Sequence, residues 1–164
     1  MNHLSQRAAI LIDEVNIYMT AKGLFGSVKV DFQSMLQQFG PREIVRAIVY
    51  CIETPENNVE MFRHNVQRLG LEVKSKPVKI FHNGKRKGDW DMGIAMDAVR
   101  LASRVDVITL VSGDGDFEEL VCYLKHQGIK VELMAFPAQV SRELLQSVDE
   151  FIPIPNTMLL NRSA

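Results

Sequence analysis

The sequence predicts a doubly wound α/β fold, in which a mostly parallel sheet of about five strands lies between helices in a Rossmann-like three-layer α/β/α sandwich. Two observations predict it. Short runs rich in β-branched residues alternate along the chain with stretches of helical periodicity, which is the order of right-handed βαβ units. Two of these runs, residues 8–13 and 105–112, are almost continuously apolar, as strands covered on both faces of a parallel sheet are.

The other strands and the helices follow from the same patterns and from stop signals. A short sixth run contains prolines, which predicts a position at the edge of the sheet. Helices are expected to end at glycines, with Gly40-Pro41, Gly70 and Gly128 as stop signals. The predicted strands are residues 8–13, 43–52, a run between 71 and 81, 105–112, 130–136 and the short 151–154; the predicted helices are 31–39, 56–69, 91–103 and 116–127.

Length and composition place the chain among ordinary globular proteins. A chain of 164 residues suits one domain, and we expect residues 1–164 to form it. The formal net charge of -1 excludes a protein that is held to nucleic acid by its overall charge, although it permits a local basic patch. Cys51 and Cys122 lie in apolar runs, as core cysteines in a reducing compartment do. Without a signal-like or bilayer-length apolar run, we expect a cytoplasmic protein.

Aspartates gather in loops that follow predicted strands. Asp13 ends the first strand, Asp89 and Asp91 precede the helix that follows the third, and Asp114 and Asp116 follow the fourth. In a doubly wound sheet these loops share the carboxyl edge, where ligands bind near the reversal of strand order. We therefore expect the carboxylates to converge.

Each aspartate also has a purely structural interpretation. Asp116, with Glu119 at capping-box spacing, could begin a helix, Asp91 could cap another, and Asp114 could be a turn residue between glycines. Converging carboxylates, however, raise one another's pKa unless a cation neutralises them. Oxygen ligands of this kind suit Mg²⁺ or Mn²⁺, and Asn16 adds an amide oxygen or a donor. A divalent-metal site is therefore predicted.

The loop after the fourth strand has a second possible use. Gly113 and Gly115 permit a sharp turn beside Ser112 and are expected to leave backbone N–H groups open. Such groups, together with the start of the next helix, can face a phosphate. Next to a metal site, the loop is consistent with a phosphodiester substrate.

A basic run leads into the aspartates. Residues 73–88 contain no Asp or Glu, and Asn83-Gly84 indicates a tight turn within them. The run could be a solvated edge strand protected by lysines, or an arm that holds the phosphates flanking a cleaved one. Trp90 could stack on a base or pack beneath its loop. The cations and the histidine of this run are Lys74, Lys76, Lys79, His82, Lys85, Arg86 and Lys87.

Other chemistry has little support in the sequence. The four histidines show no zinc-ligand spacing, and no G-x-S-x-G elbow of a serine hydrolase is present. A phosphotransferase with Asp13 as nucleophile would require an aspartate where Val15 stands. Asp97, about 120° from Asp91 around a helix axis, reaches the site only if Asp91 lies at a loose helix end. Tyr18, Lys22 and Phe25 lie in a segment after the first strand that could close over a substrate.

Three blocks of the sequence resemble the signature blocks of the NYN domain, which groups PIN-like ribonucleases, and specifically its LabA-like branch. They are ILIDEVN at 10–16, KGDWDMGIAMDA at 87–98 and LVSGDGDF at 110–117. The blocks occur in the family's order, and the resemblance extends from about residue 8 to residue 155. One departure is Glu14, which stands where the family often has a small residue.

The resemblance implies a PIN-like fold and metal-dependent hydrolysis of RNA. Asp13, Asn16, Asp91, Asp97, Ser112, Asp114 and Asp116 match the family's motif positions. We expect Asp13, Asp91, Asp114 and Asp116 to hold Mg²⁺ or Mn²⁺, with Asp97 as a further candidate and Asn16 as a companion in catalysis. Contacts to single-stranded RNA are expected from Ser112, Gly113, Gly115, Lys85, Arg86, Lys87 and Trp90.

Two questions stay open on the sequence alone. One alternative function is a non-catalytic RNA- or metal-binding regulatory domain that keeps the acids as a structural cation site. The C-terminal residues 153–160 could cover an edge strand or pair with a second copy, so a homodimer is one of two arrangements.

Overall fold

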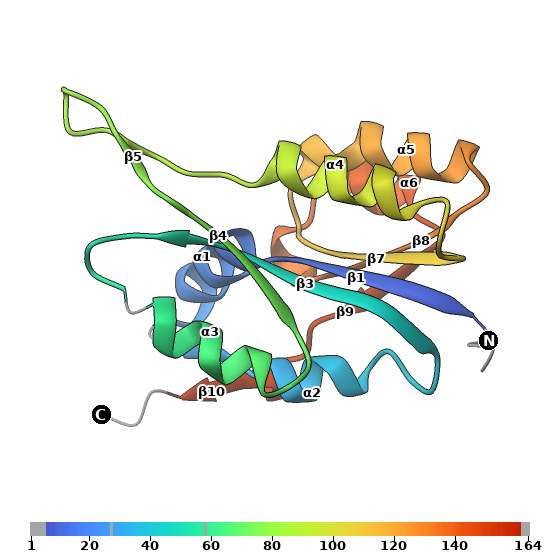
Figure 1. Ribbon diagram of the computed structural model, residues 1–164, viewed down its shortest axis with the longest axis horizontal. Coiled ribbons are helices and arrows are strands. Elements are labelled where there is room, and N and C mark those ends of the chain that lie inside the picture. The colour runs from blue at the N-terminus through green and yellow to red at the C-terminus, as the bar shows by residue number, and fades with distance from the viewer. Residues whose placement is uncertain (1–5, 27, 58, 162–164) are drawn as a thin grey trace.

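A six-stranded parallel sheet forms the centre of the computed structural model, which describes residues 6–26, 28–57 and 59–161 and confirms the predicted α/β class (Figure 1). The strand order is β4-β3-β1-β7-β8-β9, and every neighbouring pair is parallel. The strands are β1 (Arg7–Asp13), β3 (Glu43–Glu53), β4 (Glu72–Pro77), β7 (Val107–Val111), β8 (Lys130–Ala135) and β9 (Glu150–Pro153).

This order places a topological switch point beside β1. The chain moves outward from β1 through β3 to β4, then returns to the other side of β1 at β7 and continues outward through β8 to β9. Ile12 is in register with Val111, so the residues that leave β1 and β7 begin side by side. The crevice at the carboxyl ends of these two strands is where such sheets bind ligands.

Helices cover both faces of the sheet, which makes the predicted three-layer sandwich (Figure 1). Along β1, Ile10 and Ile12 pack toward the first helix group, whereas Ala9 and Leu11 pack toward the second. Both faces of the strand are thus buried, which explains its continuous apolar run. The first group is α1 (Glu14–Phe25), α2 (Phe32–Gln37) and α3 (Val59–Gln67); the second is α4 (Asp91–Leu101), α5 (Glu118–His126) and α6 (Arg142–Ser147).

Several elements differ from the prediction. The segment after the first strand, for which no helix was predicted, is helix α1, and α6 was also not predicted. The run between residues 71 and 81 is divided: β4 ends at Pro77, and β5 (Lys79–Ile80) pairs antiparallel with β6 (Arg86–Lys87) in a separate ribbon. Proline has no N–H to continue a ladder, which favours the end of β4 there. The edge position of the short C-terminal strand, β9, is confirmed.

The C-terminal residues pair within the chain. Strand β10 (Leu159–Asn161) is antiparallel to β2 (Val28–Val30), outside the main sheet. The sequence left open whether residues 153–160 pair with a second copy of the chain. In the structure the end of this segment pairs with β2 of the same chain. Three short 3₁₀ helices also occur: η1 (Gly115–Phe117), η2 (Pro137–Gln139) and η3 (Asn156–Met158). Within the described residues, none of the helices has the length and apolar character needed to cross a bilayer.

Candidate metal centre

The loops that follow β1 and β7 are joined by hydrogen bonds at the switch point. Asp13 is only 4% exposed, and one of its carboxylate oxygens accepts a hydrogen bond from the Ser112 hydroxyl at 3.0 Å. The other oxygen accepts the Asn16 N–H at 3.2 Å, so that Asp13 caps α1. Asn16 in turn accepts the Gly113 N–H at 2.9 Å through its amide oxygen. Three predicted site residues therefore fix the relative position of the two loops.

The loop after β7 is largely bonded to itself. The Ser112 hydroxyl accepts the Asp114 N–H at 3.2 Å, and Asp114 accepts the Asp116 N–H at 3.0 Å. Together with the bond from Gly113 to Asn16, these contacts use the N–H groups of residues 113, 114 and 116, in a loop whose N–H groups the sequence suggested were open to phosphate. That expectation is wrong for Gly113, because the Asn16 side chain already occupies its donor.

The two glycines of this loop provide room for a neighbouring segment. A Cβ atom on Gly113 would lie 2.5 Å from the backbone oxygen of Gln139, and one on Gly115 would lie 2.9 Å from the Ser141 hydroxyl. Ser141 also donates its N–H to the Gly113 carbonyl at 3.2 Å. The glycines thus permit the 137–141 segment to pass directly against the loop.

Three carboxylates meet beside this loop. Asp91, Asp114 and Asp116 each offer an oxygen, and these oxygens all lie within 4.8 Å of one another. Asp91 is the first residue of α4, whereas Asp114 and Asp116 belong to the loop and to η1. The structure therefore brings together acids from the second and third sequence blocks. We call Asp91, Asp114 and Asp116 the acidic cluster.

Helix capping does not account for two of the three acids. The N-cap of α4 is Trp90, and no side chain caps that helix end. The residue that caps η1 is Asp114, which leaves Asp116 without the capping role that its spacing with Glu119 suggested. In the ranges that the structure describes, no Lys or Arg forms an ion pair with any member of the acidic cluster.

The electrostatics of the site disfavour its negative charge. Burial, followed by the charges of Asp114, Asp89 and Asp116, raises the pKa of Asp91. Burial also raises the pKa of Asp13 to about 6, although the hydrogen bonds from Asn16 and Ser112 act in the opposite direction and the charges of Asp91 and Asp114 add to the increase. A bound cation would relieve these unfavourable interactions.

Glu14, the residue that departs from the family pattern, adds a half-buried acid beside Asp13. It begins α1, and burial together with the charge of Asp13 raises its pKa to about 7.

Asp97 has different surroundings. Its carboxylate accepts hydrogen bonds from Tyr50 at 2.8 Å, from Lys74 at 2.6 Å and from Arg100 at 3.2 Å. Burial alone would raise its pKa, but the bonds from Lys74, Tyr50 and Arg100 together lower it. Asp97 is therefore already neutralised by protein cations, and its oxygens are not part of the acidic cluster.

Trp90 packs beneath the loop that carries Asp91. Its indole N–H donates to the Cys51 carbonyl at 2.8 Å, and its ring lies 5.4 Å from the Tyr50 ring. The Lys76 ammonium is 4.5 Å from the ring centre, and a Cβ on Gly93 would be 2.4 Å from a ring carbon. Of the two interpretations of Trp90, packing accounts for these contacts.

The second part of the basic run, residues 79–87, forms the ribbon that projects at the upper left of Figure 1. Gly84, at φ 76°, makes the predicted turn, and its N–H donates to the Phe81 carbonyl at 2.9 Å. Lys85 is exposed, while both terminal nitrogens of Arg86 bind Glu56 at 3.0 and 2.7 Å. Lys87 ends the ribbon, with Gly88, Asp89 and Trp90 between it and Asp91.

Two residues of the basic run, Lys76 and Phe81, were not among the predicted site residues. Lys76, in the basic run, has a charge that lowers the pKa of Asp91 and therefore lies near it. Phe81, in the ribbon, is 51% exposed. The sequence did contain a signal for Phe81, since it is an aromatic residue inside a run that has no acids.

Comparison with known proteins points to the same family as the three sequence blocks. The sequence model of the NYN domain matches residues 7–157. Low amplitude and bright protein LabA from Synechococcus elongatus is 30% identical over 159 residues, covering 90% of this chain and 83% of that protein. The crystal structure of a protein of unknown function from Vibrio parahaemolyticus has a TM-score of 0.86 and 33% identity, over 98% of this chain and 99% of that one.

Proposed function

The chain belongs to the NYN domain family of PIN-like nucleases, and we propose that it is a metal-dependent ribonuclease that hydrolyses phosphodiester bonds at the acidic cluster. The observation that carries this proposal is the approach of Asp91, Asp114 and Asp116 to within 4.8 Å of one another. Three carboxylates from two loops, with no ion-paired protein cation in the described ranges, repel one another, and a bound cation would relieve this repulsion.

The donor set fits a hard divalent cation. Mg²⁺ and Mn²⁺ take carboxylate and water oxygens. The three oxygens lie within 4.8 Å of one another, so small side-chain rotations or intervening water would let them share one cation. A divalent cation held there lowers the pKa of water and offsets the charge that develops on phosphate oxygens during hydrolysis.

The surrounding residues have distinct roles in this proposal. Asp91, Asp114 and Asp116 would hold the cation, and buried Asp13 adds negative charge from the end of β1. Ser112 and Asn16 hold the two loops in register through their bonds to Asp13 and Gly113. The exposed Lys85 and Lys87 of the ribbon would bind the RNA backbone next to the cleaved bond.

A cleavage assay with purified protein tests this function. End-labelled single-stranded RNA is incubated with Mn²⁺, with Mg²⁺ or with EDTA, and single-stranded DNA of the same sequence is tested in parallel. The expected result is cleavage of RNA that requires the cation and that the Asp114→Asn protein lacks. Glu43→Gln is the matched control, since it makes the same carboxylate-to-amide change at an exposed position at the start of β3.

The same assay addresses the regulatory alternative. Binding of RNA by the parent protein without cleavage under any cation would indicate a non-catalytic domain. Equal cleavage by the parent and Asp114→Asn proteins would contradict the assignment of the acidic cluster and would indicate a contaminating nuclease.

A further inference from the structure

We propose that one face of the ribbon of residues 79–87 clamps single-stranded RNA, with Phe81 stacked on an unpaired base and Lys79, Lys85 and Lys87 binding the adjacent phosphates. This inference rests on the proposed nuclease function, because the bound RNA would be the substrate of the acidic cluster. The binding itself requires no metal, so it can be tested separately from cleavage.

The register of the ribbon determines which side chains share a face. Lys79 is opposite Lys87, and Ile80 is opposite Arg86. The Phe81 N–H donates to the Lys85 carbonyl at 2.9 Å, which extends the pairing by one step. Because side chains alternate between faces along each strand, Lys79, Phe81, Lys85 and Lys87 share one face, and Ile80 and Arg86 share the other. The aromatic ring therefore lies among three amines.

The opposite face of the ribbon is anchored to the body of the protein. Arg86 makes its two-pronged contact with Glu56, which follows β3 at the carboxyl edge of the sheet. Two parallel N–H to carboxylate bonds fix the orientation of the guanidinium more strictly than one bond would. With Arg86 held in this way, the face of Phe81 stays available to a ligand.

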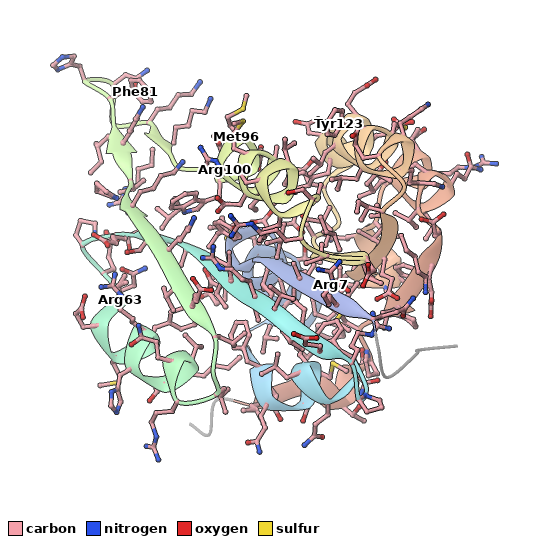
Figure 2. All side chains as sticks on the ribbon, turned by 45° about the vertical axis from the view of Figure 1, so that its right-hand side comes forward. Arg7, Arg63, Phe81, Met96, Arg100 and Tyr123 are labelled. Carbon is pink, nitrogen blue, oxygen red and sulfur yellow. The ribbon has the colours of Figure 1, made fainter. Side chains whose placement is uncertain are left out.

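Phe81 is the aromatic residue positioned to stack on a base here. Its side chain is 51% exposed, and Figure 2 shows it toward the far end of the ribbon. Trp90, the other aromatic residue in the described segment between β5 and α4, is engaged by Cys51, Tyr50 and Lys76. Single-stranded nucleic acids bind by stacking their bases on exposed aromatic side chains that lie beside basic groups, as Phe81 does here.

The charge and the course of the ribbon favour a single-stranded nucleic acid as the occupant. Within the described ranges neither Lys79 nor Lys85 forms an ion pair, whereas Lys87 lies 3.8 Å from the Asp89 carboxylate and Arg86 is paired with Glu56. The exposed amines of Lys79 and Lys85, with Lys87 beside them, make this face complementary to a chain of phosphates. An unpaired base can offer its ring face to an aromatic side chain, whereas in a duplex the base faces are covered by stacking. Because the ribbon continues directly into Asp91, a strand bound along it can extend to the acidic cluster.

The test measures binding by fluorescence anisotropy in EDTA, where cation-dependent cleavage is absent. The probes are a labelled single-stranded RNA, the duplex of the same sequence and vesicles that contain phosphatidylserine. Phe81→Ala is expected to raise the Kd for the single strand about tenfold, whereas Phe81→Trp stays within about twofold of the parent. The control is Tyr123→Ala, since Tyr123 is also an exposed aromatic residue (45%) but lies on α5, and it is expected to leave the Kd unchanged.

The dependence of binding on salt separates the two kinds of contact. Lys85→Ala is expected to decrease the slope of log K against log salt concentration by about 0.7, the value for one phosphate contact on a single strand. Phe81→Ala is expected to leave that slope unchanged, because stacking releases no counterions. The Kd for the duplex should not respond to Phe81→Ala.

Three binding results would overturn the clamp. They are no binding of the single strand by the parent protein in EDTA, a parent-like Kd for Phe81→Ala, and ribbon variants that lose vesicle binding alone, which would indicate a lipid surface instead. Cleavage that does not depend on Phe81 or Lys85 would contradict the clamp and leave the nuclease proposal standing. Single-strand binding that depends on Phe81, in a protein that does not cleave, would contradict the nuclease proposal alone.

Discussion

The Ser112 hydroxyl donates a hydrogen bond to the Asp13 carboxylate at 3.0 Å, which joins residues 99 positions apart in the sequence. The same hydroxyl oxygen accepts the Asp114 N–H at 3.2 Å. One fully buried side chain therefore connects the end of β1 to the loop that carries two members of the acidic cluster. The positions of the carboxylates depend on this connection across the switch point.

Ser112→Ala is expected to destabilise the protein by about 1–3 kcal/mol, because it leaves one oxygen of the buried Asp13 carboxylate and the Asp114 N–H without a partner, while Asn16 still donates to the other oxygen. It should also lower cation-dependent cleavage, since the loop is less well positioned. Urea unfolding and the RNA assay measure the two effects. The exposed Ser103→Ala serves as the control, with a change within about 0.5 kcal/mol. Parent-like stability and cleavage in Ser112→Ala would show that the connection is dispensable.

Two glycine substitutions are expected to change stability in opposite directions. Gly113→Ala places a methyl group 2.5 Å from the Gln139 backbone oxygen, so it should destabilise the protein by about 1–3 kcal/mol. In Gly23→Ala, within α1, the nearest atom is 4.0 Å away, and the gain in helix propensity should stabilise the protein by about 0.5–1 kcal/mol. Denaturant unfolding of both variants decides the matter, and shifts of the same sign would contradict the close approach at Gly113.

Trp90→Phe separates packing from base stacking. The substitution removes the indole N–H that binds the Cys51 carbonyl, so a loss of stability of about 1–2 kcal/mol is expected. The Kd for single-stranded RNA should stay near the parent value, because we assign stacking to Phe81. Unfolding and anisotropy titrations on the same preparation check both points. Weaker RNA binding at unchanged stability would return the stacking role to Trp90.

A buried ion pair far from the acidic cluster provides a prediction about pH. Arg42 binds Glu132 at 2.8 Å with both side chains inaccessible to water, and Thr109 and Lys130 also bind this carboxylate. Burial alone would raise the pKa of Glu132, but its bonds, first of all that from Arg42, lower it. The pair therefore contributes stability above the ordinary pKa of a glutamate, and this contribution is lost as the pH falls through the lowered value.

Arg42→Met is expected to cost about 3–5 kcal/mol at neutral pH, because it leaves Glu132 charged and buried without its main partner. The cost should become smaller below about pH 5, where the isolated carboxyl takes up a proton. Unfolding measured across this pH range tests the sign. The double substitution Arg42→Met with Glu132→Met should recover stability, and a cost that is independent of pH would contradict the assignment.

Much of the fold was predictable because burial on both faces leaves a strong local signal. The strands near residues 8–13, 105–112 and 130–136 are central in the sheet, and their apolar runs identified them. Helix α1 gave a weaker signal, since exposed Met19 and Phe25 interrupt a simple apolar stripe. The short α6, capped by Ser141, depends on its packing against α5 and η1.

The candidate site was predictable in its position but not in its contacts. Loops at the carboxyl edge bring Asp91, Asp114 and Asp116 together, whereas Asp13, expected as a fourth ligand, is buried at the end of β1 and lies outside this cluster. The bond from Gly113 to Asn16 and the neutralisation of Asp97 by Lys74 depend on segments distant in sequence, for which local patterns hold no information. The separation of the ribbon from β4, which exposes Phe81, likewise depends on the tertiary structure.

Calorimetric titration of the purified protein with Mn²⁺ tests the central claim, that Asp91, Asp114 and Asp116 hold a divalent cation. The account predicts saturable binding by the parent and Glu43→Gln proteins, and a Kd at least about tenfold higher for Asp114→Asn. Absence of binding by the parent protein, or the same Kd in Asp114→Asn, would contradict it.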